Sequence, residues 1–342
     1  MYTMGVNKPI QKHIHILGVG NIGSFIAHTL RALRPSSPAI TLLLRPAAQL
    51  QFRANDFKIV MHDAATGLSQ QQAGFRVPMP DGPASSNIQN LIVATKGYQV
   101  REALSSVRSR LDEKSTVLLL QNGVAEFEKL FPVEEWGVEG RPRVLAGVVT
   151  HGVWSEDRFR ITLAGRGETL IGAIDGVQGG LTSDQHAQRE WLLKESWLSR
   201  TMERAGAKIL APRELLAAQI RKLAVNAAIN ALSAIYKVQN GVLFETPEAV
   251  EVMRAVVGEV AQVAAGLGLD GDFSEDALWE HVLQVGEKVK LNYSSMFQDL
   301  KAKRRTEVEE INGWVVEKGR ELGVDTPLNE QLMKRVKALE RQ

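Results

Sequence analysis

Cysteine is absent from this 342-residue sequence, and that one absence excludes several classes of protein. Without thiols there is no disulfide, no thiolate metal ligand, no cysteine nucleophile and no covalent haem attachment. Seven histidines are present, but none has a metal-ligand spacing such as H-E-x-x-H, so we expect no metal. The missing cysteine leaves the redox compartment open.

Two further absences concern location. The sequence contains no run of 18 apolar residues and no charged-then-apolar leader, which predicts neither a membrane span nor a secretory signal. No Asp or Glu precedes Asp56, a bias shared with mitochondrial presequences, although most of that segment is expected to fold. We therefore expect a cytoplasmic protein without a membrane partner, and a mitochondrial location is the alternative.

The sequence also lacks a large excess of positive or negative charge. The 41 Lys and Arg residues nearly balance 39 Asp and Glu, which leaves a formal charge of +2 and argues against a nucleic-acid partner. Hydrophobic residues make up 44% and charged residues 23% of the chain, as in a globular protein with a sizeable core. At roughly 150 residues per domain, the length favours two domains.

The first part of the chain alternates strand and helix patterns, which is typical of a doubly wound parallel sheet. After a tail at residues 1–12, we expect strands at 13–17, 40–44, 91–95 and 116–120, with helices at 24–33 and 99–111. Polar, turn-rich residues at 81–86 indicate a loop. Short strands at 144–171, a loop at 176–180 and a helix near 185–205 complete this part. The sequence thus predicts a Rossmann-type α/β domain over residues 13–212.

The second part lacks strand patterns. Pro212 is typical of a first helical turn, so we place a domain boundary there. Apolar spacing then predicts helices at 213–236, 247–266, 275–289, 305–322 and 329–340. We expect an all-α domain over residues 213–342.

A glycine-rich turn lies between the first strand and the first helix. Gly18, Gly20 and Gly23, with Asn21 and Ile22 between them, match G-x-G-x-x-G in the strand-to-helix context that this motif requires. The first glycine makes a tight turn, the second admits a pyrophosphate, and the third lets helix and strand pack closely. We predict a dinucleotide site that uses the helix N-terminus.

Arg45 follows the second strand, where an acidic residue usually holds the ribose hydroxyls of NAD. A carboxylate would repel a 2′-phosphate, whereas a guanidinium binds it. The sequence therefore favours NADPH over NADH, and a solvated surface arginine is the alternative interpretation.

Polar groups recur every four residues in the otherwise apolar segment 222–232. Lys222, Asn226 and Asn230 fall within about 80° of one another on a helix. Because a buried amide without a partner costs roughly 1–3 kcal/mol, the stripe suggests a lined cleft. A helix with one wetted edge is the alternative.

Taken together, the residues resemble the ketopantoate reductases (2-dehydropantoate 2-reductases), NADPH-dependent members of the 6-phosphogluconate dehydrogenase-like superfamily. The resemblance covers nearly the whole chain. Besides the glycine turn and the 222–230 stripe, it includes Ala94-Thr95-Lys96 with Gln99, Gln121-Asn122-Gly123, Thr150-His151-Gly152, Asn240-Gly241, Ser294-Ser295-Met296, Thr306-Glu307 and Ile311-Asn312-Gly313. It implies a second domain like the C-terminal domain of 6-phosphogluconate dehydrogenase.

The resemblance also assigns roles. It implies that Lys222 is the general acid and that Glu307 is the carboxylate that supports it, although Glu307 alone would read as part of a charged, solvated face. Cofactor binding is implied for Lys96, Gln99 and Asn122, which otherwise resemble strand-end surface. Substrate binding is implied for Asn122, Asn226, Asn230, Asn240, Asn292 and Ser295, with helix capping as the alternative for Asn292 and Ser295.

The implied reaction reduces 2-dehydropantoate to (R)-pantoate, a step toward pantothenate and coenzyme A, with substrate between two domains that close. Another branched 2-oxo acid remains an alternative substrate, and a non-catalytic NADP-binding regulator is the rival from another class. Two features depart from the family pattern. The chain has a tail before the first strand, and Leu163 stands where many relatives carry His. The expected partner is a small 2-oxo acid, and the amphipathic helices of the second domain are consistent with either a core or a homodimer interface.

Overall fold

The computed structural model describes residues 12–78, 87–137, 139–174 and 183–341. The loops expected at 81–86 and 176–180, and all but the last residue of the expected tail, lie outside these residues. The chain forms two compact units. The first comprises residues up to Thr95, then Gln99–Gln121 and Ala125–Pro212. The second comprises Arg213 onward together with two short segments, Lys96–Tyr98 and Asn122–Val124.

A seven-stranded sheet organises the first unit, in the order β11-β10-β7-β6-β5-β1-β2. The strands from β7 to β2 run parallel, whereas β10 is antiparallel to β7. This confirms the expected doubly wound α/β fold. The strands are β1 (His13–Leu17), β2 (Ala39–Leu43), β5 (Asn90–Val93), β6 (Thr116–Leu119), β7 (Arg143–Val149), β10 (Thr169–Ile174) and β11 (Lys208–Leu210).

Helices cover both faces of this sheet, which explains why its central strands are almost continuously apolar. Ile92 faces the core that includes α1 (Asn21–Arg31) and α7 (Trp197–Arg204). Its neighbours Leu91 and Val93 face the opposite core, with α3 (Val100–Ser105), α4 (Phe127–Leu130) and α5 (Val133–Trp136). Successive side chains of a strand point to opposite faces, so each core receives every second residue.

Two expected helices are broken. The helix predicted at 99–111 consists of a 3-10 turn Gly97–Gln99 (η1), α3 and a second 3-10 turn Arg108–Arg110 (η2). The Ser105 and Ser106 hydroxyls bond back to the carbonyls of Arg101 and Ala103, which competes with continued helix. The helix predicted near 185–205 divides into α6 (Ser183–Lys194) and α7, because Ser196 caps α7.

A second sheet, of four strands, belongs to the same unit and packs on α1. Its order is β4-β3-β9-β8, with β3 (Ile59–Asp63), β4 (Ser69–Gln72), β8 (Gly152–Asp157) and β9 (Arg160–Gly165). The helix α2 (Pro46–Ala54) precedes it in the chain. The short strands expected at 144–171 are confirmed, whereas β3 and β4 were not expected. The sequence of β4 is entirely polar, so it carries no apolar alternation that would indicate a strand.

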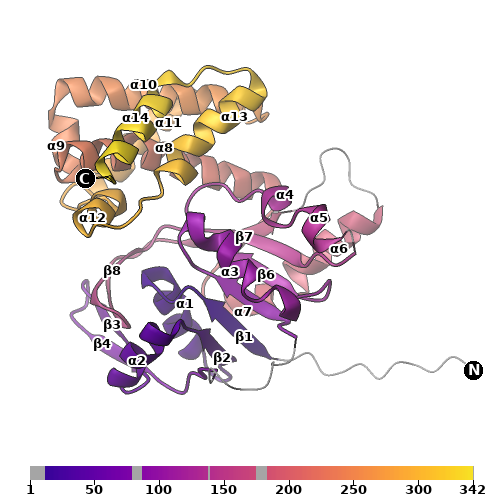
Figure 1. Cartoon of the computed structure of the whole chain (residues 1–342). Coiled ribbons are helices and arrows are strands. Elements are labelled where there is room, and N and C mark those ends of the chain that lie inside the picture. Colours follow the sequence, from indigo (N-terminus) through magenta and orange to yellow (C-terminus); the bar gives the residue numbers. More distant parts are fainter. Residues whose placement is uncertain (1–11, 79–86, 138, 175–182, 342) are drawn as a thin grey trace, which may run out of the picture. The chain divides into compact units, whose positions relative to one another are not determined.

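The second unit is helical, as expected (Figure 1). Its helices are α8 (Pro212–Tyr236), α9 (Asn240–Glu245), α10 (Pro247–Gly266), α11 (Glu275–Lys288), α12 (Ser295–Lys301), α13 (Trp314–Leu322) and α14 (Pro327–Leu339). A π-helical turn, η3 (Glu309–Gly313), leads into α13, so the helix expected from residue 305 begins later. The core is built on α8 and α10, whose small apolar residues lie fully buried. Within the described residues, no helix is both long and apolar enough to cross a membrane.

Candidate active site

The glycine-rich turn has the geometry of an anion cradle. Gly18 has a φ of +87°, and a Cβ there would lie 2.5 Å from the Thr95 nitrogen. A Cβ on Gly23 would lie 2.2 Å from the Gly18 carbonyl oxygen, so this glycine permits close packing of helix and turn. By contrast, a Cβ on Gly20 would meet nothing within 4 Å. The space beside Gly20 therefore opens onto the N-terminus of α1, which has no acidic residue in its first turn and no side-chain cap.

Asn21 and Ile22 have engaged side chains. The Asn21 amide donates to the Val153 carbonyl at 3.3 Å and accepts from the Ser155 hydroxyl at 2.7 Å. Ile22 is half-buried against the core of the first unit. Their backbone N–H groups lie at the start of α1, where helical N–H groups have no partner within the helix and can donate to an anion.

Arg45 lies directly after β2, as the N-cap residue of α2. Its carbonyl accepts hydrogen bonds from the Ala48 and Gln49 nitrogens at 2.9 and 3.0 Å, while the residue is exposed. Because β1 and β2 are parallel neighbours, Arg45 lies at the same edge of the sheet as the glycine turn. An adenosine 2′-phosphate at this edge would meet a guanidinium.

Glu307 is the centre of a polar cluster in the helical unit, where its side chain is almost wholly buried. Its Oε2 accepts from the Lys96 ammonium at 3.0 Å and from the Asn122 amide at 2.9 Å, and its Oε1 accepts from the Gly97 N–H at 3.0 Å. Burial alone would raise the pKa of this carboxyl, but Lys96, the Gly97 N–H and the Asn122 amide together hold that pKa below its usual value. Glu307 is therefore ionised at neutral pH.

Lys222, on α8, joins the cluster through Asn122. Its Nζ donates to the Asn122 Oδ1 at 2.9 Å. Burial lowers the pKa of the Lys222 ammonium to about 8, although the Glu307 charge acts to raise it. A lysine that titrates near neutrality can give up and recover a proton, which suits a general acid.

Lys96 lies between two buried carboxylates. Besides Glu307, it contacts Asp299 of α12 at 2.8 Å, and these carboxylates raise the pKa of the Lys96 ammonium against the effect of burial. The sequence patterns did not predict a role for Asp299. Its one signal was helical spacing from Met296, which is also buried, in a helix whose other charged residue is exposed.

The polar stripe of α8 is divided between half-buried and buried positions. Lys222 and Asn226 are half-buried, whereas Asn230 is buried. The Asn230 carbonyl accepts from the hydroxyls of Ser233 and Ser294, at 3.2 and 3.4 Å. These bonds place the start of α12 beside the end of the stripe.

Two of the remaining predicted residues occur next to each other. Asn240 donates its backbone N–H to the Asn292 carbonyl at 2.9 Å and its side-chain amide to the Val289 carbonyl at 3.2 Å. The Asn240 Oδ1 is buried and has no hydrogen-bond partner among the described residues. Asn292 is exposed.

The capping interpretation of Ser295 is wrong, because Ser294 caps α12 by accepting from the Phe297 N–H at 3.1 Å. Ser295 is the first helical residue and is exposed. Gln99 is half-buried at the end of η1 and belongs to the first unit, whereas Lys96 belongs to the second. In the described part of the chain, no three acidic or histidine side chains gather as a metal site would require.

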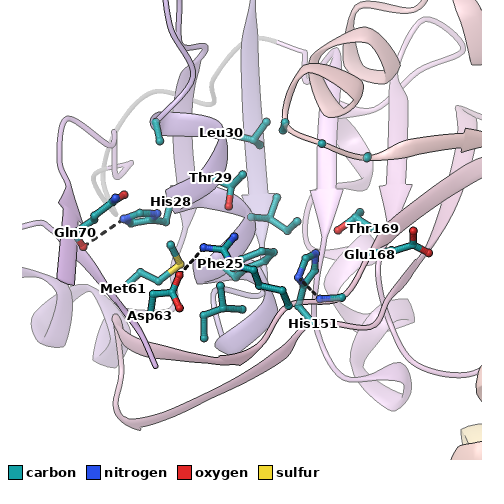
Figure 2. Close-up of a pocket in the computed structure, with 18 of the residues that line it drawn as sticks. Phe25, His28, Thr29, Leu30, Met61, Asp63, Gln70, His151, Glu168 and Thr169 are labelled. Carbon is teal, nitrogen blue, oxygen red and sulfur yellow. Dashed lines mark hydrogen bonds and ion pairs between the residues drawn. The ribbon is translucent and has the colours of Figure 1, made fainter. Parts of the chain in front are cut away.

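A cavity of about 570 Å³ lies in the first unit, along α1 from Phe25 onward. Figure 2 shows polar groups of its wall bonded to one another. His28 contacts the Gln70 carbonyl at 3.3 Å, and His151 accepts from the Gly167 N–H at 3.0 Å. Burial lowers the pKa of both histidines, so both are neutral at pH 7. The cluster around Glu307 offers more chemistry, with an acid, a carboxylate and an amide in contact.

The fold and the site define a class: an oxidoreductase with a Rossmann-type unit and a helical unit that carries the polar cluster around Glu307. Two family models match the chain, "Ketopantoate reductase PanE/ApbA" over residues 14–176 and "Ketopantoate reductase PanE/ApbA C terminal" over residues 214–340. The chain belongs to the ketopantoate reductase family.

Individual relatives of known sequence or structure belong to the same family. The chain is 30% identical over 344 residues to a probable 2-dehydropantoate 2-reductase of Schizosaccharomyces pombe, with 94% of each chain covered. It is also 30% identical to 2-dehydropantoate 2-reductase of Archaeoglobus fulgidus, covering 96% of this chain and 98% of that one. Among solved structures, the probable 2-dehydropantoate 2-reductase of Bacillus subtilis superposes with a TM-score of 0.66 at 27% identity, covering 96% and 99% of the two chains.

Proposed function

We propose that the protein reduces 2-dehydropantoate to (R)-pantoate with NADPH, a step toward pantothenate and coenzyme A. The observation that carries the proposal is the hydrogen-bonded series from Lys222 through Asn122 to Glu307, with 2.9 Å at each step. It joins a proton donor to a buried carboxylate in a chain that belongs to this family. When bound, the nicotinamide supplies a hydride to the C2 ketone.

Lys222 supplies the proton. Its ammonium stabilises the charge that develops on the ketone oxygen and then transfers a proton to that oxygen. Asn122 accepts from Lys222 and donates to Glu307, so its amide orientation is fixed from both sides. The Glu307 charge raises the pKa of Lys222 against the effect of burial, which keeps the acid protonated at neutral pH.

The residues of the first unit fit NADPH. The open space at Gly20 and the uncapped start of α1 suit a pyrophosphate, and the exposed Arg45 suits the 2′-phosphate. The backbone of Asn21 and Ile22 would complete this cradle. Gln99 of the first unit would contact the remaining part of the cofactor, and the resemblance implies the same role for Lys96 and Asn122, which belong to the second unit.

The substrate's carboxylate and hydroxyl end requires donors and acceptors that add no net charge. The helical unit supplies such groups in two neighbourhoods: the α8 stripe of Asn226 and Asn230, where Asn230 contacts the start of α12, and Asn240 beside Asn292. Ser295 adds an exposed hydroxyl at the start of α12. The buried Asn240 oxygen, which lacks a partner among the described residues, would accept the substrate's hydroxyl directly or through water.

Oxidation of NADPH, followed by its absorbance, tests the proposal. Ketopantoate is compared with ketoisovalerate and pyruvate, and NADH replaces NADPH in a parallel series. We expect efficient turnover with ketopantoate and NADPH, and little with the other combinations. Turnover confined to another 2-oxo acid would establish the alternative substrate. Tight NADPH binding without turnover on any acid would indicate the regulatory alternative. Light scattering on the same preparation determines whether the protein is a homodimer.

A further inference from the structure

Lys96 makes contacts that a residue serving only the cofactor would not need. Its Nζ lies 3.0 Å from the Glu307 Oε2 and 2.8 Å from the Asp299 Oδ2. Both carboxylate side chains are 4% exposed, whereas the Lys96 side chain is 34% exposed. One partly wetted cation thus joins two carboxylates that are almost entirely removed from water.

Two buried carboxylates so close to one ammonium would repel each other without it. Removing one partner from a buried ion pair leaves an uncompensated charge, which the protein relieves by protonation or by movement. Asp299 has a second cation, since the Arg304 guanidinium contacts its Oδ1 at 3.0 Å. At Glu307, the other direct contacts come from the neutral Gly97 N–H and Asn122 amide. Among the residues that the structure describes, Lys96 is therefore the cation that directly contacts Glu307.

We propose that Lys96 is a positioning residue for the reaction: anchored by Asp299, its ammonium holds the Glu307 carboxylate ionised and in place against Asn122. Lys96 then acts on Lys222 through Glu307 and Asn122, without touching the reacting atoms. The inference rests on the proposed function for its catalytic consequence. Its structural content, a charge coupling between Lys96 and Lys222, can be measured in the unliganded protein.

The sign of the coupling follows from the charges that face the cluster. These are Lys96 and Tyr98 from the segment after β5, Asp299, Arg304 and Arg305 from α12 and the following loop, Glu310 from η3, and Lys222 from α8. Loss of Lys96 removes the cation that contributes most to keeping the pKa of Glu307 low, so that pKa rises. A protonated Glu307 is neutral and no longer stabilises the Lys222 ammonium by charge attraction. The pKa of Lys222 therefore falls. Direct repulsion between the two ammonium groups would have the opposite effect.

The experiment replaces Lys96 and follows Lys222. Protein labelled with ¹³C at the lysine ε-carbon is titrated by NMR without ligand, and the Lys222 resonance is identified by its absence in Lys222→Arg. In the unsubstituted protein we expect a pKa of about 8 for Lys222. In Lys96→Met we expect a lower pKa for Lys222 and, in the assay of NADPH and ketopantoate, roughly a tenfold loss of kcat at pH 8. The range of pH in which the enzyme is active should narrow from both sides.

Matched variants separate this role from others. Lys96→Arg keeps the charge and should retain the Lys222 titration, and Lys334→Met removes an exposed lysine of α14 and should change nothing. If Lys96→Met does not fold, as judged by circular dichroism, Lys96→Gln removes the charge but keeps an amide that can donate to a carboxylate. An unchanged or raised Lys222 pKa in folded Lys96→Met or Lys96→Gln would overturn the proposal, even with weaker NADPH binding. If the unsubstituted protein reduces no 2-oxo acid, the proposed function fails, whereas the NMR titration still decides the coupling.

Discussion

The Lys222 ammonium donates a hydrogen bond to the Asn122 side-chain oxygen at 2.9 Å, although 100 residues separate them in sequence. The nitrogen of the same amide donates to Glu307. An amide can accept from an ammonium through its oxygen and donate to a carboxylate through its nitrogen without carrying charge. The Lys222 ammonium and the Glu307 carboxylate are thereby linked through one neutral side chain.

Replacement of Lys222 by methionine should abolish most turnover. General acid catalysis contributes about 10²–10⁴-fold, so kcat for ketopantoate reduction should fall by that order in Lys222→Met. The NADPH Kd, measured by fluorescence titration, should stay within about twofold, because Lys222 belongs to the helical unit and the glycine turn to the other. Parallel loss of turnover and NADPH binding would contradict the assigned role. Lys288→Met, an exposed lysine of α11, is the control.

The reduction should slow as pH rises through about 8. Lys222 must be protonated to act as an acid, and burial lowers its pKa to about 8, so kcat is highest below this pH and declines above it. In Glu307→Gln the Coulombic support for the ammonium is lost, so the decline should begin at lower pH. Profiles of kcat from pH 6 to 10 measure both. A decline at unchanged pH in Glu307→Gln would show that the two charges are not coupled.

Arg45 should control the preference between cofactors. Arg45→Asp replaces a guanidinium by a carboxylate at the end of β2, which repels a 2′-phosphate and can bind ribose hydroxyls. We expect kcat/KM for NADPH to fall by at least about tenfold relative to that for NADH. Arg53→Asp makes the same charge change at an exposed position of α2. Equal effects of the two substitutions would mean that Arg45 does not hold the phosphate.

The glycines of the turn should respond differently to alanine. A methyl group on Gly20 meets nothing within 4 Å, so Gly20→Ala should leave the melting temperature nearly unchanged while weakening NADPH binding by filling the cradle. A methyl group on Gly23 would lie 2.2 Å from the Gly18 oxygen. Gly23→Ala should therefore destabilise the fold by about 1–3 kcal/mol. Thermal unfolding with and without NADPH separates the two effects. Weak NADPH binding with a lowered melting temperature in Gly20→Ala would be the contrary result.

Helices and strands were predicted well where the sequence marks both of their ends. The helix expected at 247–266 is α10, since Pro247 begins it and Gly266 ends it. The strand at 13–17 is β1. The helix expected from residue 305 begins later, because the π-helical turn η3 depends on buried contacts such as that of Asn312 with Asn329. The apolar periodicity of a segment gives no information about contacts with residues distant in the sequence.

The candidate site was predictable only in part, for a related reason. Lys222 and its stripe stand out because polar residues recur in an apolar helix, and the glycine turn stands out by its spacing. The placement of Lys96 does not stand out, because its two partners lie 203 and 211 residues away. Asp299 is one acidic residue among many in the sequence, and its spacing from Met296 is a weak signal beside the burial that the structure shows. The roles assigned to these residues stay predictions until the variants are measured.

The segments Lys96–Tyr98 and Asn122–Val124 belong to the helical unit, although they follow β5 and β6 of the other unit. The two halves of this protein are consequently not interchangeable parts. A fragment that begins at Arg213 would bury Glu307 after losing the Lys96, Gly97 and Asn122 donors that now surround it. A chimera that exchanges helical units between relatives would have to carry both short segments with it, because recombination at Pro212 would separate Glu307 from its Lys96, Gly97 and Asn122 donors.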